Sequence, residues 1–203
     1  MEETKIQFSP AEMELMCNAQ VILTKNRVLY GIKQLLEGLE QRLAKEAYFL
    51  NEPSLTEYFN APPKISRGEN YLGLPYLVLD YPRHFDSVNI LAIRTMFWWG
   101  HSFSSTLHLS GSLKELFTEK LEAFYFSLSK GNYYIGVNED PWQHHFEEDN
   151  YLPINGMSEE AFGSYCREYD HLKLAKQFPL QEIESIEEDL LNSWRALINT
   201  LKH

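Results

Sequence analysis

The chain has 203 residues, and its content of 44% hydrophobic and 14% aromatic residues predicts a folded domain rather than a disordered chain. No apolar run reaches the roughly 18 uncharged residues of a membrane helix, and the acidic start MEETKIQFSP lacks the pattern of a secretory signal. We therefore expect a soluble, cytoplasmic protein that folds as a single domain over residues 1–203.

The net charge is −11, and most of it lies in the last third of the chain. Residues 1–138 contain 15 acidic and 13 basic residues, whereas residues 139–203 contain 14 acidic and 5 basic residues. Because a negative field repels phosphate backbones, we expect no nucleic-acid partner. We also expect no membrane partner. The acidic C-terminal third favours instead docking onto a basic protein surface.

Two helices are predicted before the first strand. Ser9 can cap a short helix that begins at Pro10, because a proline at the first helical position loses no hydrogen bond. Over residues 19–46, leucine and isoleucine recur every three or four positions, which predicts a longer helix with one buried stripe. We expect residues 1–50 to pack as a helical segment on the sheet, and the proline-rich residues 50–70 to form a loop or arm.

Residues 74–81 and 90–109 are predicted to form an antiparallel pair of central strands. The second segment, ILAIRTMFWWGHSFSSTLHL, is apolar, aromatic and β-branched along its length, so we expect one long strand. The period of two places Arg94, Trp98 and His108 together on one face of that strand. These three side chains resemble the lining of a pocket mouth.

The remaining elements are predicted from caps and periodicity. Ser112 followed by Glu115 has the spacing of a capping box, and the helix that it starts is expected to stop at Lys130-Gly131. Later elements are expected as a short strand at 133–137, an acidic loop at 140–156, a helix at 158–168, a strand from His171, and an amphipathic C-terminal helix from Ile183 to Leu201.

Helices flank a run of strands and do not alternate strictly with them. This order predicts an α+β fold, with a mainly antiparallel sheet of about four strands, helices packed on it, and long N-terminal and C-terminal helices. Cys17 and Cys166 lie in predicted helices and do not form a CxxC pair, so we expect two small buried apolar side chains, with a catalytic thiol as the alternative.

Arginines and aromatic residues gather around the central strands. Two arginines beside aromatic rings can hold a carboxylate or a phosphate through planar sets of donors. The structural alternative is that Arg67 and Arg83 pair with Glu69 and Asp80 to fix the ends of loops. The predicted pocket for a small anionic molecule or a partner is bounded by Arg67, Tyr81, Arg83, Arg94, Trp98 and His108.

Histidines supply the candidates for catalysis and for metal binding. His101 or His108 beside Asp80 would suit general acid–base chemistry, although a hydrogen-bonded core histidine is the simpler alternative. In the acidic loop, the weak metal candidates are His144, His145 and Glu147, without an HExxH motif or a second histidine cluster to complete the ligands.

The sequence lacks the motifs of several enzyme classes. We find no Walker loop, no Rossmann fingerprint, no GxSxG elbow and no Ser-x-x-Lys pair, so nucleotide binding and hydrolysis by those routes are not predicted. We expect no cofactor. The sequence leaves the catalytic residues and the oligomeric state undetermined.

The segment from Ile65 to Tyr81, followed by AIRTMFWWG at 92–100, resembles an uncharacterised family of small cytoplasmic bacterial proteins over most of the chain. The resemblance implies no activity and no site residues. Three hypotheses follow from the residues: a non-catalytic protein with a binding pocket beside the central strands, an enzyme of unrecognised class, and an interaction module that uses the acidic C-terminal third.

Overall fold

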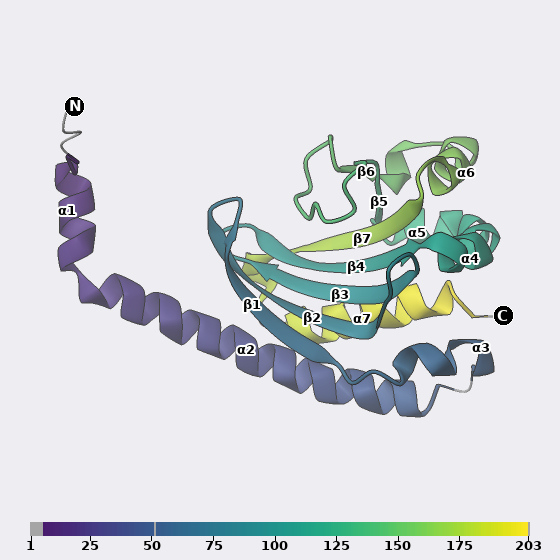
Figure 1. The fold of residues 1–203 in the computed structure, drawn as a ribbon, viewed down its shortest axis with the longest axis horizontal. Coiled ribbons are helices and arrows are strands. Elements are labelled where there is room, and N and C mark those ends of the chain that lie inside the picture. The colour runs from purple at the N-terminus through teal and green to yellow at the C-terminus, as the bar shows by residue number, and fades with distance from the viewer. Residues whose placement is uncertain (1–5, 51, 203) are drawn as a thin grey trace.

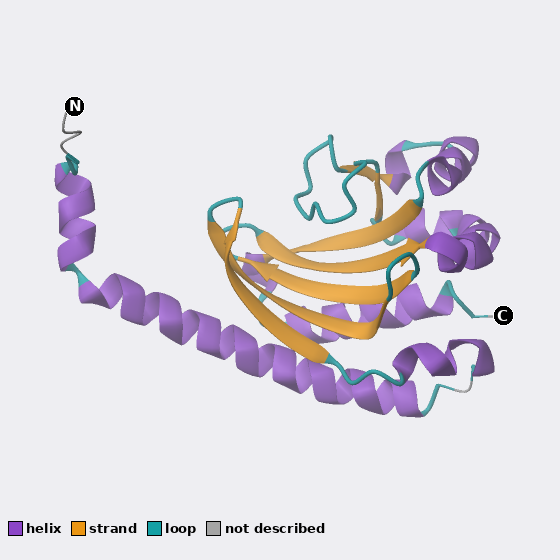
Figure 2. Cartoon of the chain, viewed as in Figure 1, coloured by secondary structure: helices purple, strands orange, loops and turns teal. Residues whose placement is uncertain are grey.

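The computed structural model describes residues 6–50 and 52–202. It confirms an α+β fold built on an open, curved antiparallel sheet with the strand order β1-β2-β3-β4-β7-β5-β6 (Figures 1 and 2). The strands are β1 (Lys64–Tyr71), β2 (Leu74–Phe85), β3 (Ile90–Trp98), β4 (Ser102–Ser110), β5 (Tyr134–Gly136), β6 (Tyr151–Pro153) and β7 (His171–Pro179). The expected sheet of about four strands was therefore too small, since these strands number seven.

Helices cover one face and one end of the sheet (Figure 2). The α-helices are α1 (Pro10–Cys17), α2 (Ala19–Tyr48), α3 (Pro53–Thr56), α4 (Gly111–Ala123), α5 (Tyr125–Lys130), α6 (Glu159–Glu168) and α7 (Ile186–Asn199). Three short 3₁₀ turns cover Glu57–Phe59, Ile154–Gly156 and Leu180–Glu182. The second half of α2 and the C-terminal helix α7 pack side by side against β2, β3 and β4.

The predicted strand over 90–109 is wrong, because the segment forms the hairpin β3–β4. The chain turns at Gly100, which has a φ of +76°. Glycine adopts this conformation at little cost because it has no Cβ. The predicted division between faces nevertheless holds for the strand residues. Partners across the hairpin, such as Arg94 with Thr106 and Ala92 with His108, are both even-numbered, so each face keeps the same residues as in a single strand.

The two faces of the sheet have different chemistry. The helix-covered face is apolar and packs Ile93, Phe97 and Phe103 against α2 and α7 in the main core. The other face carries polar side chains. Arg94 is half-buried, and the buried ones are Asp80, Thr106, His108, His171 and Lys173. Because buried polar groups are costly unless they are bonded, this polar face is where a site is expected.

Several predicted helix ends are confirmed and one is wrong. Ser9 caps α1 with a capping box to Glu12, and Ser158 caps α6. The predicted capping box at Ser112 does not form, because the Ser112 backbone N–H and hydroxyl donate to Asn89 Oδ1 at 2.9 and 2.8 Å. Helix α4 therefore begins at Gly111, against the turn between β2 and β3.

The structure differs from the sequence-based expectations at three other places. The expected loop at 50–70 contains α3 and the edge strand β1. Cys166 is buried as predicted, but Cys17 is exposed, so the prediction of a buried Cys17 is wrong. Ile183 lies before α7 and is also exposed, although the rest of the predicted apolar stripe, from Ile186 to Leu201, is buried.

Gly111 gives a direct test of the junction between the sheet and α4. Its φ is +59°, and an added Cβ would lie 2.5 Å from Asn89 Oδ1 and 2.9 Å from the Val88 carbonyl oxygen. We expect Gly111→Ala to lower the free energy of unfolding, measured in urea, by about 1–3 kcal/mol or more. Gly73→Ala is the matched control, since Gly73 has a φ of +83° with no atom within 4 Å of the added Cβ. Equal losses in both variants would show that the contact with Asn89 adds nothing.

Candidate functional site

A loop, residues 137–150, lies over the polar face of the sheet (Figure 1) and is held there by Tyr71 at the end of β1. The Tyr71 hydroxyl accepts hydrogen bonds from the backbone N–H groups of His144, at 2.7 Å, and His145, at 3.1 Å. The indole of Trp98 donates to the Tyr71 carbonyl at 3.2 Å. Trp98 therefore helps to position the tyrosine that anchors the loop.

An ion pair between neighbouring strands occupies the centre of this face. Arg94 on β3 donates from Nε and Nη2 to the two carboxylate oxygens of Asp80 on β2, at 2.8 and 2.9 Å. A third nitrogen of Arg94, Nη1, lies 3.1 Å from Nε2 of His144 in the loop. Burial and the charge of Arg94 lower the pKa of His144 well below its usual value, so this imidazole accepts from the guanidinium.

Lys173 on β7 is a buried amine beneath the same loop. Its Nζ donates to the Gln143 carbonyl at 2.6 Å and lies 4.8 Å from the centre of the Tyr151 ring. Burial lowers the pKa of Lys173 to about 7, and the positive charge of Arg94 acts in the same direction, against the opposing effect of Asp140. At neutral pH the ammonium is therefore much less favoured than at an exposed lysine.

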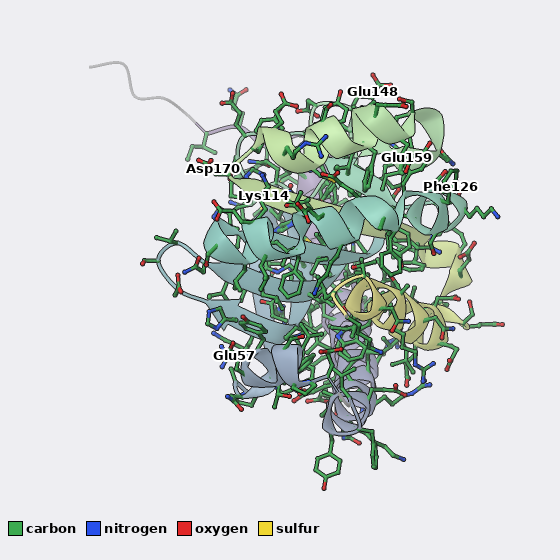
Figure 3. The ribbon with its side chains drawn as sticks, turned by 90° about the vertical axis from the view of Figure 1, so that its right-hand side faces the viewer. Glu57, Lys114, Phe126, Glu148, Glu159 and Asp170 are labelled. Carbon is green, nitrogen blue, oxygen red and sulfur yellow. The ribbon has the colours of Figure 1, made fainter. Side chains whose placement is uncertain are left out.

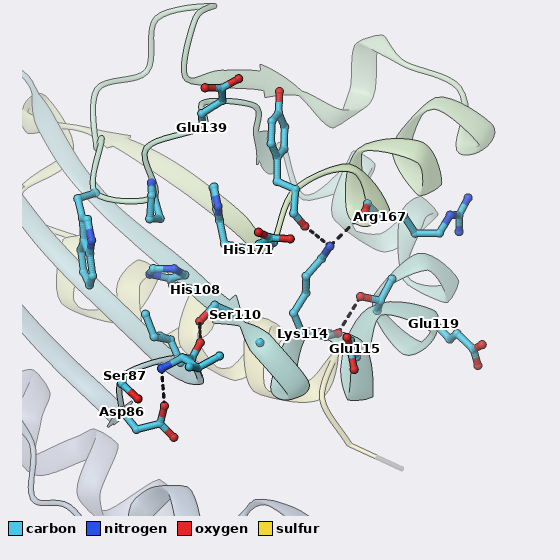
Figure 4. A pocket seen from close by; sticks show the side chains of 18 residues that line it. Asp86, Ser87, His108, Ser110, Lys114, Glu115, Glu119, Glu139, Arg167 and His171 are labelled. Carbon is cyan, nitrogen blue, oxygen red and sulfur yellow. Dashed lines mark hydrogen bonds between the residues drawn. The ribbon is translucent and has the colours of Figure 1, made fainter.

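An open pocket of about 1030 Å³ lies at the end of the polar face, beside α4 (Figure 4). It is formed by the turn between β2 and β3, the adjoining ends of β3 and β4, the start of α4, the loop around Trp142, and the junction between α6 and β7. Lys114 on α4 and Asp170 at that junction lie on the same side of the molecule (Figure 3). The volume is at the upper end of the range of roughly 300–1,000 Å³ that is common for sites of small ligands.

Carboxylates outnumber available cations in this pocket. Asp86 is held by the backbone N–H groups of Val88 and Asn89, which lower its pKa to about 2. Four more carboxylates line the pocket and make no hydrogen bond or ion pair within residues 6–50 and 52–202: Glu115, Glu119, Glu139 and Asp170.

The two cations of the pocket are already engaged. Lys114 Nζ donates to the carbonyl oxygens of Arg167, at 3.3 Å, and of Tyr169. The guanidinium of Arg167 pairs with Glu122, outside the pocket. The lining therefore has unbalanced negative charge at neutral pH.

Two neutral imidazoles project into the pocket from β4 and β7 (Figure 4). His108 and His171 are 6% and 7% exposed, and the Nε2 atom of each lacks a hydrogen-bond partner in the part of the chain that the structure describes. Burial lowers the pKa of His108 to about 3 and also lowers that of His171. Buried polar atoms without a partner are rare in folded proteins.

The structure brings together only part of the predicted pocket. Arg94 and His108 lie on the polar face, and Trp98 lies farther along it, stacked on His101 with ring centres 3.5 Å apart. Arg67 pairs with Glu69 on β1, and Arg83 Nε donates to the Pro62 carbonyl at 2.6 Å. Tyr81 lies in the apolar core, where its ring contacts Phe59, and so faces away from the site.

The candidates for catalysis and for metal binding are also dispersed. Asp80 binds Arg94 and makes no hydrogen bond to His101 or His108 among the described residues. His144 contacts Arg94, whereas His145 contacts Tyr71 and Asp149, and Glu147 is exposed. Within residues 6–50 and 52–202, no group of three His, Cys, Asp or Glu side chains is arranged to hold a metal ion.

Most of the pocket is not predictable from the sequence. Lys114, Glu139, Asp170 and His171 come from different elements and form no spaced motif. The one available signal was the strand pattern from His171, which places His171 and Lys173 on the same face of β7. The pairing of Ser110 with His171 then brings this face beside His108.

Comparison of the chain with family models, with curated proteins and with solved structures found no match. Helices that are both long and apolar enough to cross a membrane are also not found among the described residues. The functional inference therefore rests on the geometry of the site.

Proposed function

We propose that the protein is a non-catalytic binding protein, and that the pocket beside α4 takes a cationic nitrogen group, an ammonium or a guanidinium. The observation that carries the proposal is the charge of the lining: four carboxylates have no hydrogen bond or ion pair among the described residues, whereas Lys114 is the single cation of the lining that is not paired with a carboxylate there, since Arg167 pairs with Glu122. A cation entering the pocket would balance that charge.

The imidazoles support the same ligand chemistry. His108 and His171 line the pocket as neutral rings and add no positive charge to it. A protonated histidine would repel a cation, and the lowered pKa values keep both rings neutral at physiological pH. Trp142 and Tyr169 add aromatic surface to the lining, which also favours cationic groups.

The charge distribution supports a cation over the small anion expected from the sequence. Each arginine of the predicted pocket is bonded within the protein: Arg94 to Asp80, Arg67 to Glu69 and Arg83 to a carbonyl. An anion would have to displace one of these bonds. Catalysis by His108 is disfavoured for a different reason, since a base with a pKa of about 3 is poorly matched to neutral pH.

The proposal is tested by thermal unfolding of the purified chain with four probes: a diamine, a short lysine- and arginine-containing peptide, phosphate and citrate. We expect at least one cationic probe to raise the melting temperature, because a ligand at a hundred times its Kd adds about 2.7 kcal/mol of stability. A response to the diamine would indicate a small amine, and a response to the peptide alone would indicate a basic protein segment. Stabilisation by the anions alone would overturn the proposal.

Paired substitutions locate the binding site. Glu139→Gln with Asp170→Asn removes two pocket carboxylates, and we expect the affinity for the cationic probe, measured by calorimetry, to fall about tenfold or more. Glu147→Gln with Glu148→Gln is the control, because it removes the same charge from exposed positions of the same loop outside the pocket. Equal losses in the two variants would assign binding to the general negative field and contradict the proposed site.

A further inference from the structure

Four aromatic rings form a continuous row along the pocket beside α4. Trp142 of the loop contacts His108 of β4 edge to face, with ring centres 5.4 Å apart. His108 in turn contacts His171 of β7 at 6.1 Å, and His171 stacks on Tyr169 at 5.8 Å. All four residues line the pocket. We call these four side chains the aromatic wall.

The aromatic wall is uncharged and partly open to solvent. The indole of Trp142 is 47% exposed and Tyr169 is half-buried, so both offer ring surface to a ligand. Burial lowers the pKa of both imidazoles, and neither is charged at neutral pH. The guanidinium of Arg94 lies 5.8 Å from the centre of the Trp142 ring, but Asp80 balances its charge. Uncharged rings attract a cation through their electron-rich faces.

Several fixed hydrogen-bond acceptors of the pocket already have donors. Lys114 Nζ donates to the carbonyl oxygens of Arg167 and Tyr169, and the carboxylate of Asp86 accepts from two backbone N–H groups and a side-chain amide. The carboxylates that remain are all exposed: Glu115, Glu119, Glu139 and Asp170. Exposed carboxylates are hydrated, so a ligand N–H would exchange one bond to water for another bond of similar strength. The lining thus offers attraction to a positive charge but few fixed acceptors for N–H groups.

We infer that the cation is a trimethylammonium group, held against the aromatic wall and surrounded by the four exposed carboxylates. This inference rests on the proposed function and names the class of ligand. A trimethylammonium group has no N–H, so its burial leaves no hydrogen bond unmade. Its methyl groups bury apolar surface on the rings, while its charge is attracted by the ring faces and by the carboxylates.

The charge of the pocket limits which trimethylammonium compounds fit. An anionic group close to the nitrogen, as in betaines and phosphate esters, would be repelled by the same carboxylates. Choline and the end of a trimethylated lysine side chain carry no such group. The open pocket, of about 1030 Å³, has room for either.

The first test is calorimetric titration of the full chain with choline, its uncharged isostere 3,3-dimethylbutan-1-ol, glycine betaine and putrescine. We expect choline to bind at least tenfold more tightly than the isostere or the betaine, and about fivefold more tightly than putrescine. Tighter binding of putrescine would overturn the trimethylammonium inference and leave the proposed function standing. If neither cation bound, both would fail. An isostere as tight as choline would overturn the inference, because charge would then contribute nothing.

A peptide arm of the titration distinguishes the two sources of the group. A short peptide with one trimethyllysine is compared with its unmethylated form, and we expect the methylated peptide to bind at least fivefold more tightly. Tighter binding of that peptide than of choline would assign the pocket to a methylated protein, and weaker binding would assign it to a free small molecule. Preference for the unmethylated peptide would contradict the inference.

Substitutions in the aromatic wall form the second test. Trp142→Leu and Tyr169→Leu should each lower the affinity for choline about fivefold or more, and change that for putrescine less than twofold. Phe126→Leu is the matched control, because Phe126 is a 66% exposed aromatic residue of α5 outside the pocket. Equal losses for choline and putrescine would show a general distortion of the pocket and contradict a role of the rings.

Fluorination tests the indole without changing its shape. In protein that contains 5,6,7-trifluorotryptophan throughout, the electron-rich ring face is weakened, and we expect the affinity for choline to fall about threefold or more while that for the uncharged isostere is kept. The other three tryptophans lie outside the lining of this pocket: Trp98, Trp99 and Trp194. Unchanged choline affinity in both Trp142→Leu and the fluorinated protein would overturn the inference.

Discussion

Replacing Arg94 with methionine is expected to lower the free energy of unfolding by about 3–5 kcal/mol. The change removes the guanidinium and leaves Asp80, whose side chain is 9% exposed, as a buried carboxylate without its ion-pair partner. It also removes the contact with His144, which helps to hold the loop of residues 137–150 over the sheet. Urea unfolding at neutral pH measures the loss.

Two further variants separate the cost of an isolated charge from the value of the ion pair. Asp80→Leu with Arg94→Met removes both charges, and we expect most of the stability to return, because apolar side chains can replace a buried ion pair at little cost. Arg67→Met breaks the exposed pair with Glu69 and should cost no more than about 1 kcal/mol. If the double variant were as unstable as Arg94→Met, the cost would lie in lost packing rather than in the isolated charge.

The stability of the protein is expected to increase with pH between 7 and 8.5 because of Lys173. Its pKa is about 7 in the folded protein, below the usual value of roughly 10.4. As pH rises, the folded protein therefore releases this proton at a lower pH than the unfolded chain does. Above pH 7 the unfolded chain therefore holds more protons, and the free energy of unfolding rises with pH. The expected gain is about 1.5 kcal/mol over this window, and on the order of 4 kcal/mol up to the pKa of the unfolded chain.

Lys173→Met should abolish this increase, whereas Lys176→Met, on the same strand, should keep it. Denaturant unfolding at intervals of pH gives both curves. Two other buried groups do not contribute to the increase between pH 7 and 8.5. His108 titrates below it, and Cys166, whose pKa burial raises to about 12, lowers stability as pH rises above about 8.5. A wild-type curve parallel to that of Lys173→Met would show that the buried amine does not titrate near neutral pH.

The hairpin shows what periodicity can and cannot predict. The faces of residues 90–109 follow from alternation alone, and Arg94 and His108 were correctly placed together. The turn at Gly100 was missed because it is a lone glycine between aromatic residues, without the Asn-Gly or Asp-Gly pair that marks a tight turn. A turn changes the direction of the chain while leaving the pattern of apolar and polar residues intact.

The missing strands carry weak local signals. Strand β1 lies at the edge of the sheet, and its residues 64–71 are mostly polar and partly exposed, so no buried alternation marks it. Strand β6 has three residues and depends on pairing with β5, which the aromatic and β-branched run at 133–137 predicts. A strand as short as β6 is specified by its contacts with the rest of the sheet rather than by its own sequence.

The candidate site is predictable only in part for the same reason. The place of His108 on the polar face follows from the strand pattern. The pocket itself forms where β4, α4, the end of α6 and the loop of residues 137–150 meet. The acidic character of the last third of the sequence was visible, and Glu139 and Asp170 belong to it. That they surround one cavity depends on the pairing of β7 with β4, which brings together segments about sixty residues apart.

The two edges of the sheet are poor templates for strand addition. On one edge, β1 exposes the charged side chains of Lys64, Arg67 and Glu69, and Lys25 of α2 bonds to Glu69 from the side. The other edge, β6, is three residues long and ends at Pro153, which has no N–H to donate. Charges, proline and short length all hinder pairing with a strand of another molecule. An open sheet with these edges should resist fibril formation even at high protein concentration.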